Sequence, residues 1–407
     1  MLRSSCVSRI IPIALSFAAL LTATSIAPAC DLCGVPTPTL AEMLAQADAV
    51  VQAQWIGNEK GKDANGPGTT IFEVTIVVRD KGNKLKPRDQ ITVAGQTAGK
   101  KGEFFLFVGR QTDKLEWDSP QKVSEAGFKY LVEAPALEAP PVERLAYFLK
   151  FLEFPDNFVA NDAFAEFVRA PFEDIILLKD QLPREKLRRW LLAPKVPEGR
   201  RGLYGLMLGL CGEPADVKLL EEIIVRPAQE TRPGIEGIMG GYLLLAGERG
   251  LEFIEKTKFQ NREIVTSETY SAMQAVRFLW ANGGGQFSHV RVQQSARLLL
   301  DNADFTELVV ADLARWKDWS VTPKLMEMYG VGQFNDSGTK KAIVRFLLTA
   351  ASDTGPPAGE AADNPQAGPP HVIEAKKCLE TLRERDPKTV SQVEKFFRPV
   401  RIGIKPR

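Results

Sequence analysis

The chain has 407 residues, of which 44% are hydrophobic and 25% are charged, so it is long enough to bury more than one core. Its 52 basic and 51 acidic residues nearly cancel, which argues against a nucleic-acid partner because such proteins carry a strongly basic face. The chain contains only two histidines, His289 and His371, and this scarcity excludes most histidine-dependent metal and acid–base chemistry.

Residues 1–29 are predicted to be a signal peptide. Arg3 and Arg9 give a positively charged start, residues 10–26 are largely apolar, and residues 27–29 (Ala-Pro-Ala) place small side chains at a cleavage site. We therefore expect an exported protein, periplasmic or extracellular, that begins at Cys30. A cysteine at this place leaves lipidation open, and we expect contact with a membrane only if Cys30 is lipidated.

Residues 30–120 are predicted to form a small antiparallel β-domain. A short helix at 37–49 opens it, with Thr39 as N-cap and Glu42 completing a capping box. Alternation of period two then predicts strands at 49–55, 69–78, 90–94, 103–108 and 115–117, with loops at 58–68 and 81–88. Short strands without a long helix between them indicate an antiparallel barrel or sandwich rather than a parallel sheet.

Five segments of this region follow each other in a familiar order: Cys30 to Cys33, QADAVV at 46–51, TIFEV at 70–74, KLKP to ITV at 84–93, and GEFFLF at 102–107. This order resembles the netrin/TIMP-like module, an OB-type β-barrel whose mature N-terminus is a cysteine. In the metalloproteinase inhibitors of that family the terminal cysteine binds the target's zinc, a role that the resemblance would give to Cys30. The sequence departs from the family here, because the family opens with Cys-x-Cys and has further cysteines that pin the terminus to the barrel. We therefore expect the fold without the inhibition.

Cys30 and Cys33 are the weak candidates for metal or thiol chemistry. No βαβ unit follows them, as a thioredoxin-like centre requires, and a zinc site needs two further ligands, which the neighbouring sequence does not offer. In an oxidising compartment a local disulfide between Cys30 and Cys33 is the expected state. A redox or metal role for the pair stays open beside it.

From residue 121 onward the sequence has helical periodicity, and we predict a helical connecting region at 121–197. Phenylalanines recur there at helical spacing, at positions 148, 151, 154, 158, 164, 167 and 172. Such spacing is typical of a core stripe, so we do not interpret these rings as a ligand site.

Residues 198–397 are predicted to form a helical repeat domain. Helical hairpins begin near Arg200, Gly234, Thr266, Asp304 and Ser337, and each joins an apolar helix through a tight turn to a second amphipathic helix. This pattern resembles HEAT-type repeats, which stack because one pair cannot bury its apolar face alone. A non-repetitive helical bundle is the alternative.

Three further features belong to this domain and to the end of the chain. Residues 354–370 are dominated by Gly, Pro, Ala and Asn and are predicted to be a flexible insertion. Residues 398–407 are predicted to be a solvated basic tail. Cys211 and Cys378 lie on apolar helix faces and are interpreted as core residues.

The fold class that these elements predict is multidomain α+β, a small antiparallel β-barrel followed by an α-helical solenoid. The sequence contains no nucleophile elbow, phosphate-binding loop or zinc-protease motif, so we predict no catalytic residues, no metal and no cofactor. The two parts together resemble those of secreted bacterial proteins that open with Cys-x-x-Cys, a resemblance that brings no activity with it. We expect a non-enzymatic scaffold of the bacterial envelope that binds a protein partner on its helical-repeat face. The alternative is a thiol-redox or metal-handling protein that uses Cys30 and Cys33.

Overall fold

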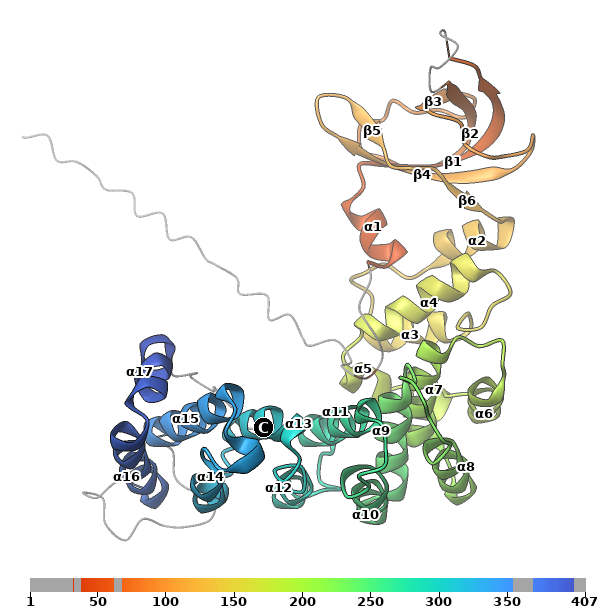
Figure 1. The fold of residues 1–407 in the computed structure, drawn as a ribbon. Coiled ribbons are helices and arrows are strands. Elements are labelled where there is room, and N and C mark those ends of the chain that lie inside the picture. Colours follow the sequence, from red (N-terminus) through yellow and green to blue (C-terminus); the bar gives the residue numbers. More distant parts are fainter. Residues whose placement is uncertain (1–31, 33–37, 62–67, 354–368, 399–407) are drawn as a thin grey trace, which may run out of the picture.

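The computed structural model describes residues 32, 38–61, 68–353 and 369–398. Within these residues the protein has two arms that meet at an angle (Figure 1). One arm consists of a β-sheet and the helices that follow it, and the second is a layered array of helices. The predicted signal peptide, Cys30, Cys33, nearly all of the predicted insertion and residues 399–407 of the basic tail lie outside the described residues.

The sheet is antiparallel throughout and has six strands: β1 (Ala49–Glu59), β2 (Thr69–Asp80), β3 (Gln90–Ala94), β4 (Phe104–Gln111), β5 (Leu115–Trp117) and β6 (Gln121–Val123). The strand order is β3-β2-β1-β4-β5, and β6 pairs with the other end of β4. Among the described residues no strand joins β3 to β5, so the sheet is open along this path. The antiparallel architecture is thus confirmed, and its closure into a barrel stays a prediction.

Two parts of the strand prediction were wrong. β1 continues to Glu59, into the predicted loop at 58–68, because Asn58 pairs with Thr70 and accepts a hydrogen bond from its hydroxyl at 2.7 Å. β6 lies where helical periodicity was predicted to begin, since residues 121–123 pair with β4 instead. The first helix after the sheet therefore starts at Glu125.

Both faces of the central strand β1 are buried. Val51 contributes to a small core of its own within the sheet, where Phe72 packs edge-to-face on Phe105 and Phe107 at 5.1 and 4.9 Å between ring centroids. Val50, the neighbouring residue on the opposite face, belongs to the main core shared with the helices. The sheet is therefore packed onto the helical part of the molecule rather than tethered to it.

Helix α1 (Leu40–Gln46) precedes the sheet and has the predicted capping box. Thr39 accepts a hydrogen bond from the backbone of Glu42, whose carboxylate accepts one from the backbone of Thr39. After the sheet come α2 (Glu125–Glu133), α3 (Pro141–Leu149), α4 (Asn157–Arg169), α5 (Phe172–Ile176), the 3₁₀ turn η1 (Lys179–Gln181) and α6 (Arg184–Leu192). The phenylalanines of this region are buried or pack against the main core, which confirms their interpretation as core residues.

Five helical pairs form the second arm. They are α7 (Glu198–Cys211) with α8 (Pro214–Ile224), α9 (Ile235–Ala246) with α10 (Glu248–Ile254), α11 (Thr266–Asn282) with α12 (His289–Arg297), α13 (Ala303–Arg315) with α14 (Thr322–Met328), and α15 (Ser337–Ser352) with α16 (Pro370–Arg385), followed by α17 (Pro387–Phe396). Each pair begins within two residues of its predicted start. In Figure 1 the first helices of the pairs lie side by side in one layer and the second helices form the layer beneath.

Short irregular segments connect some of these helices: the π-helical η2 (Glu255–Phe259) and the 3₁₀ turns η3 (Trp319–Val321) and η4 (Gly332–Phe334). No helix among the described residues is both long enough and apolar enough to cross a membrane.

Helices α7 and α9 touch through their backbones. Each carries the spacing Gly-x-x-Gly-x-x-x-Gly, at Gly202, Gly205 and Gly209 and at Gly234, Gly237 and Gly241. A Cβ atom at Gly241 would lie 2.0 Å from the carbonyl oxygen of Gly205, and one at Gly237 would lie 2.5 Å from that of Gly202. No side chain larger than hydrogen fits at these two positions, so the glycines set the distance between the first two pairs.

Candidate functional site

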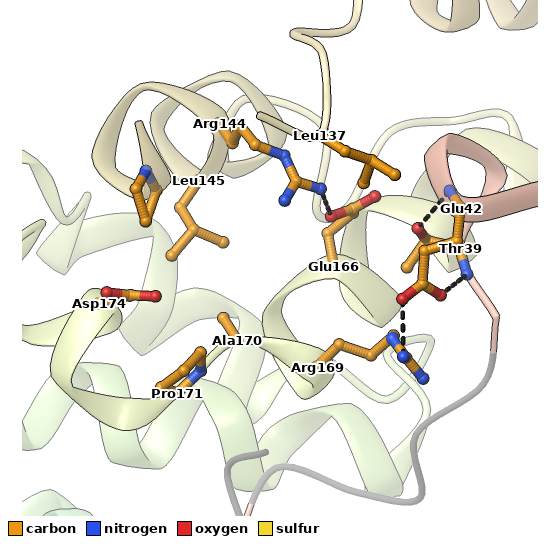
Figure 2. A pocket seen from close by; sticks show the side chains of 11 residues that line it. Thr39, Glu42, Leu137, Arg144, Leu145, Glu166, Arg169, Ala170, Pro171 and Asp174 are labelled. Atoms are coloured by element: carbon orange, nitrogen blue, oxygen red, sulfur yellow. Dashed lines mark hydrogen bonds and ion pairs between the residues drawn. The ribbon is translucent and has the colours of Figure 1, made fainter. Parts of the chain in front are cut away.

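A pocket of about 190 Å³ lies where α1 meets the helices of the first arm (Figure 2). We call it the junction pocket. Its lining comes from α1, from the segment before α3, and from α3, α4 and the start of α5, and comprises Thr39, Glu42, Leu137, Pro141, Arg144, Leu145, Glu166, Arg169, Ala170, Pro171 and Asp174.

Two ion pairs cross this pocket. Arg169 of α4 contacts the Glu42 carboxylate of α1 at 2.6 Å, and Arg144 of α3 contacts the Glu166 carboxylate of α4 at 2.6 Å. Glu42 also completes the capping box at the N-terminus of α1, so one carboxylate both caps the helix and links it to α4. The pairs join α1, and through it the sheet, to the helical part of the arm.

Glu166 has the most perturbed carboxylate of the pocket. Its residue is only 5% exposed, and burial raises the pKa of the carboxyl to about 7 even though Arg144 favours the charged form. One of its oxygens, Oε1, and the Nε atom of Arg144 are buried without a hydrogen-bond partner in the described protein. Both atoms are enclosed by the surrounding protein, and the raised pKa lets Glu166 exchange a proton near neutral pH.

Asp162 lies one helical turn before Glu166 and belongs to the same junction. It accepts hydrogen bonds from the Leu40 backbone at 2.7 Å and from the Tyr130 hydroxyl at 2.6 Å. Burial raises the pKa of Asp162 despite these bonds. The carboxylate therefore anchors the first turn of α1 and is enclosed by its own partners.

The sequence-predicted candidates Cys30 and Cys33 lie outside the described residues, but Leu32, between them, is described. Leu32 is 2% exposed and belongs to the main core. A Cβ atom at Gly240 of α9 would lie 2.5 Å from its Cδ1 atom, so the glycine makes room for the leucine. Leu32 is thereby packed against α9 of the helical array.

The two cysteines among the described residues, and both histidines, pack against neighbouring side chains. Cys211 and Cys378 are partly buried free thiols that pack against the core; burial raises the pKa of Cys211 to about 11 and also raises that of Cys378, which disfavours the reactive thiolate. His289 stacks on Trp280, with ring centroids 4.1 Å apart, and His371 stacks on Trp319 at 5.7 Å. Within the described residues no group of three or more His, Cys, Asp or Glu side chains is arranged to hold a metal ion.

Buried acidic residues connect successive helical pairs, and we call these contacts the inter-pair ion pairs. Glu268 of α11 accepts hydrogen bonds from Arg232 at 2.6 and 2.7 Å and from the buried Lys258 at 2.7 Å. Asp312 of α13 accepts one from Arg277 of α11 at 2.6 Å. Charged residues inside a helical array are tolerated when they are paired in this way.

The inter-pair ion pairs carry a signal that the sequence analysis missed. Their partners are 35 or 36 residues apart, close to the spacing between the starts of successive helical pairs: Arg232–Glu268, Glu255–Arg291, Arg277–Asp312 and Lys317–Asp353. Opposite charges that recur at this spacing on otherwise apolar helices would have pointed to these contacts.

Helices α11, α13 and α15 leave one stripe exposed, because neighbouring helices flank them and the second layer covers them from behind. We call this stripe the array face; it comprises the exposed residues Tyr270, Leu308, Ala311, Arg315 and Arg345 and the half-buried residues Gln274, Arg277, Lys341 and Thr349. In Figure 1 this layer lies on the inside of the angle between the two arms.

Comparisons with protein-family models, with curated proteins and with solved structures found no match to this chain.

Proposed function

We propose that this protein is an exported, non-enzymatic scaffold of the bacterial envelope that binds a protein partner on the array face. In this proposal the helical pairs form a HEAT-like solenoid and the open sheet is a netrin/TIMP-like, OB-type module. The observation that carries the proposal is the array face itself, a stripe of exposed and half-buried side chains that continues over three helices and is supported from behind by a second layer.

The composition of the array face supports a protein partner. Tyr270 and Leu308 are 43% and 38% exposed, and the arginines 277, 315 and 345 lie on the same stripe. Tyrosine and arginine are enriched where proteins bind one another, because each offers a large contact area with a polar end.

The inter-pair ion pairs also support the proposal. The contact between Arg277 and Asp312 links α11 to α13, and the contact between Lys317 and Asp353 links the residues that follow α13 and α15. These contacts fix the spacing of the helices that carry the array face. A surface that is ordered before binding loses little conformational entropy on association.

The test compares matched substitutions on the two layers. Y270E and L308E alter the array face, whereas V290E and I373E place the same charge on similarly exposed apolar residues of the second layer. We expect the first two variants to lose partner capture from envelope extracts and the second two to retain it. Equal capture by all four variants would overturn the proposal. A photo-crosslinking residue at position 270 then identifies the partner directly.

A further inference from the structure

A groove with a volume of about 450 Å³ lies between α15 and α17, at the far end of the helical array. We call it the C-terminal groove. It is lined by Lys341, Arg345 and Thr349 of α15, by Gln392, Val393 and Phe396 of α17, and by Phe397 and Arg398, which follow. Lys341 and Arg345 also belong to the array face, so the groove continues that face.

The groove carries uncompensated positive charge. Lys341, Arg345 and Arg398 line it, and no carboxylate does so within the described chain. The acidic residues nearby have other partners: Glu394 contacts Arg383 at 2.7 Å, and Asp386 lies 3.5 Å from Lys340. None of the ion pairs formed by the described residues involves the three groove cations.

The same groove has an apolar surface. Phe396 is 74% exposed, more than any other large hydrophobic side chain of the described residues, and Val393 beside it is buried. The Lys395 ammonium lies 5.7 Å from the centroid of the Phe396 ring, which adds a fourth positive charge at the rim. Exposed phenylalanine between cations fits a ligand that is both anionic and apolar.

We infer that the C-terminal groove binds an acidic peptide segment that carries an aliphatic or aromatic side chain. Glutamate or aspartate would contact Lys341, Arg345 and Arg398, and the apolar side chain would cover Phe396. The recess between two helices favours a peptide over an anionic bilayer, because an extended chain can enter a recess that a flat headgroup surface only spans. The inference rests on the proposed function, since it assigns a chemistry to part of the partner.

The experiment measures fluorescence anisotropy of a labelled short peptide of alternating glutamate and leucine, with the purified full chain. A glutamine–leucine peptide is the control ligand. We expect K341E/R345E to weaken binding by about tenfold or more, and F396A, a truncation of an exposed ring that leaves the core untouched, to weaken it severalfold. K376E/K377E, which makes the same charge change on exposed residues of α16, should change affinity less than about twofold.

Three results would overturn the inference. These are equal affinity for the glutamine–leucine peptide, equal loss in the α15 and α16 double variants, and binding of phosphatidylglycerol vesicles without binding of the peptide. The last result would make the groove a membrane contact. Failure of the proposed function is seen separately: there, Y270E and L308E leave partner capture intact while peptide binding still depends on Lys341 and Arg345.

Discussion

Gly241→Ala tests whether the backbone contact between α7 and α9 sets the distance between the first two helical pairs. The added Cβ would lie 2.0 Å from the Gly205 carbonyl oxygen, whereas ordinary contacts begin near 3.4 Å, so the helices would have to separate by about 1.4 Å. The obstacle is backbone, and no side-chain rotation relieves it.

The magnitude follows from two opposing effects. Overpacking a well-packed core typically costs about 1–3 kcal/mol, and the rigid neighbour places Gly241 at or above the upper end of that range. Alanine favours a helix over glycine by about 1 kcal/mol, which offsets part of the loss. We therefore expect Gly241→Ala to lower the free energy of unfolding by about 2 kcal/mol.

The assay is urea unfolding monitored by far-ultraviolet circular dichroism. The midpoints are compared between variants whose unfolding free energy depends on urea concentration with the same slope. Gly199→Ala is the control, because Gly199 lies in the same helix α7, is exposed, and has no heavy atom within 4 Å of an added Cβ. This variant should be unchanged or more stable by up to about 1 kcal/mol. If the two alanine variants unfold at the same urea concentration, the close contact does not set the distance between the first two helical pairs.

Three further changes probe buried groups. E268Q should lower the free energy of unfolding by about 3–5 kcal/mol, because it leaves the buried Lys258 without a counter-charge, and K258M should cost less; equal urea midpoints would contradict this. Glu166, with its pKa raised from 4.5 to about 7, binds its proton more tightly in the folded state, so its stabilising contribution is complete below pH 4.5 and is lost as the pH rises to about 7. The unfolding free energy of wild type minus that of E166Q should therefore fall by up to about 3 kcal/mol across that range, and a flat difference would refute the assignment. L32A should cost about 2–5 kcal/mol in thermal unfolding, since Leu32 packs fully buried at Gly240, and an unchanged midpoint would show that this contact contributes nothing.

The features that local sequence determines could be predicted. The capping box of Thr39 and Glu42 depends on residues three apart, and it is present as expected. The starts of the helical pairs were predicted to within two residues, because apolar periodicity and turn residues mark them. The predicted end of β1 was wrong, because Asn58 pairs with Thr70 although the sequence around it has the composition of a loop.

The features of the candidate site are non-local, and the sequence did not reveal them. Glu42 was assigned only to the cap of its own helix, although its carboxylate also contacts Arg169 on α4. Cys30 and Cys33 drew attention by their chemistry, whereas the described residue between them is a core residue. Glu166 lies on an amphipathic helix like many solvated glutamates, and only the packing of α1 and α3 around it buries the carboxylate and raises its pKa.

Successive helical pairs of the array contact each other in two different ways, and the difference bears on how the array face keeps its shape. The first two pairs meet through glycine backbones, whereas later pairs add buried ion pairs, such as those of Glu268 and Asp312, to their apolar packing. A buried ion pair adds little net stability compared with apolar packing, but a shift in register that separates its partners leaves a buried charge unpaired, at about 3–5 kcal/mol. We infer that these charges act on register more than on stability. Each pair can then stack in only one alignment, and the exposed residues of α11, α13 and α15 stay in line.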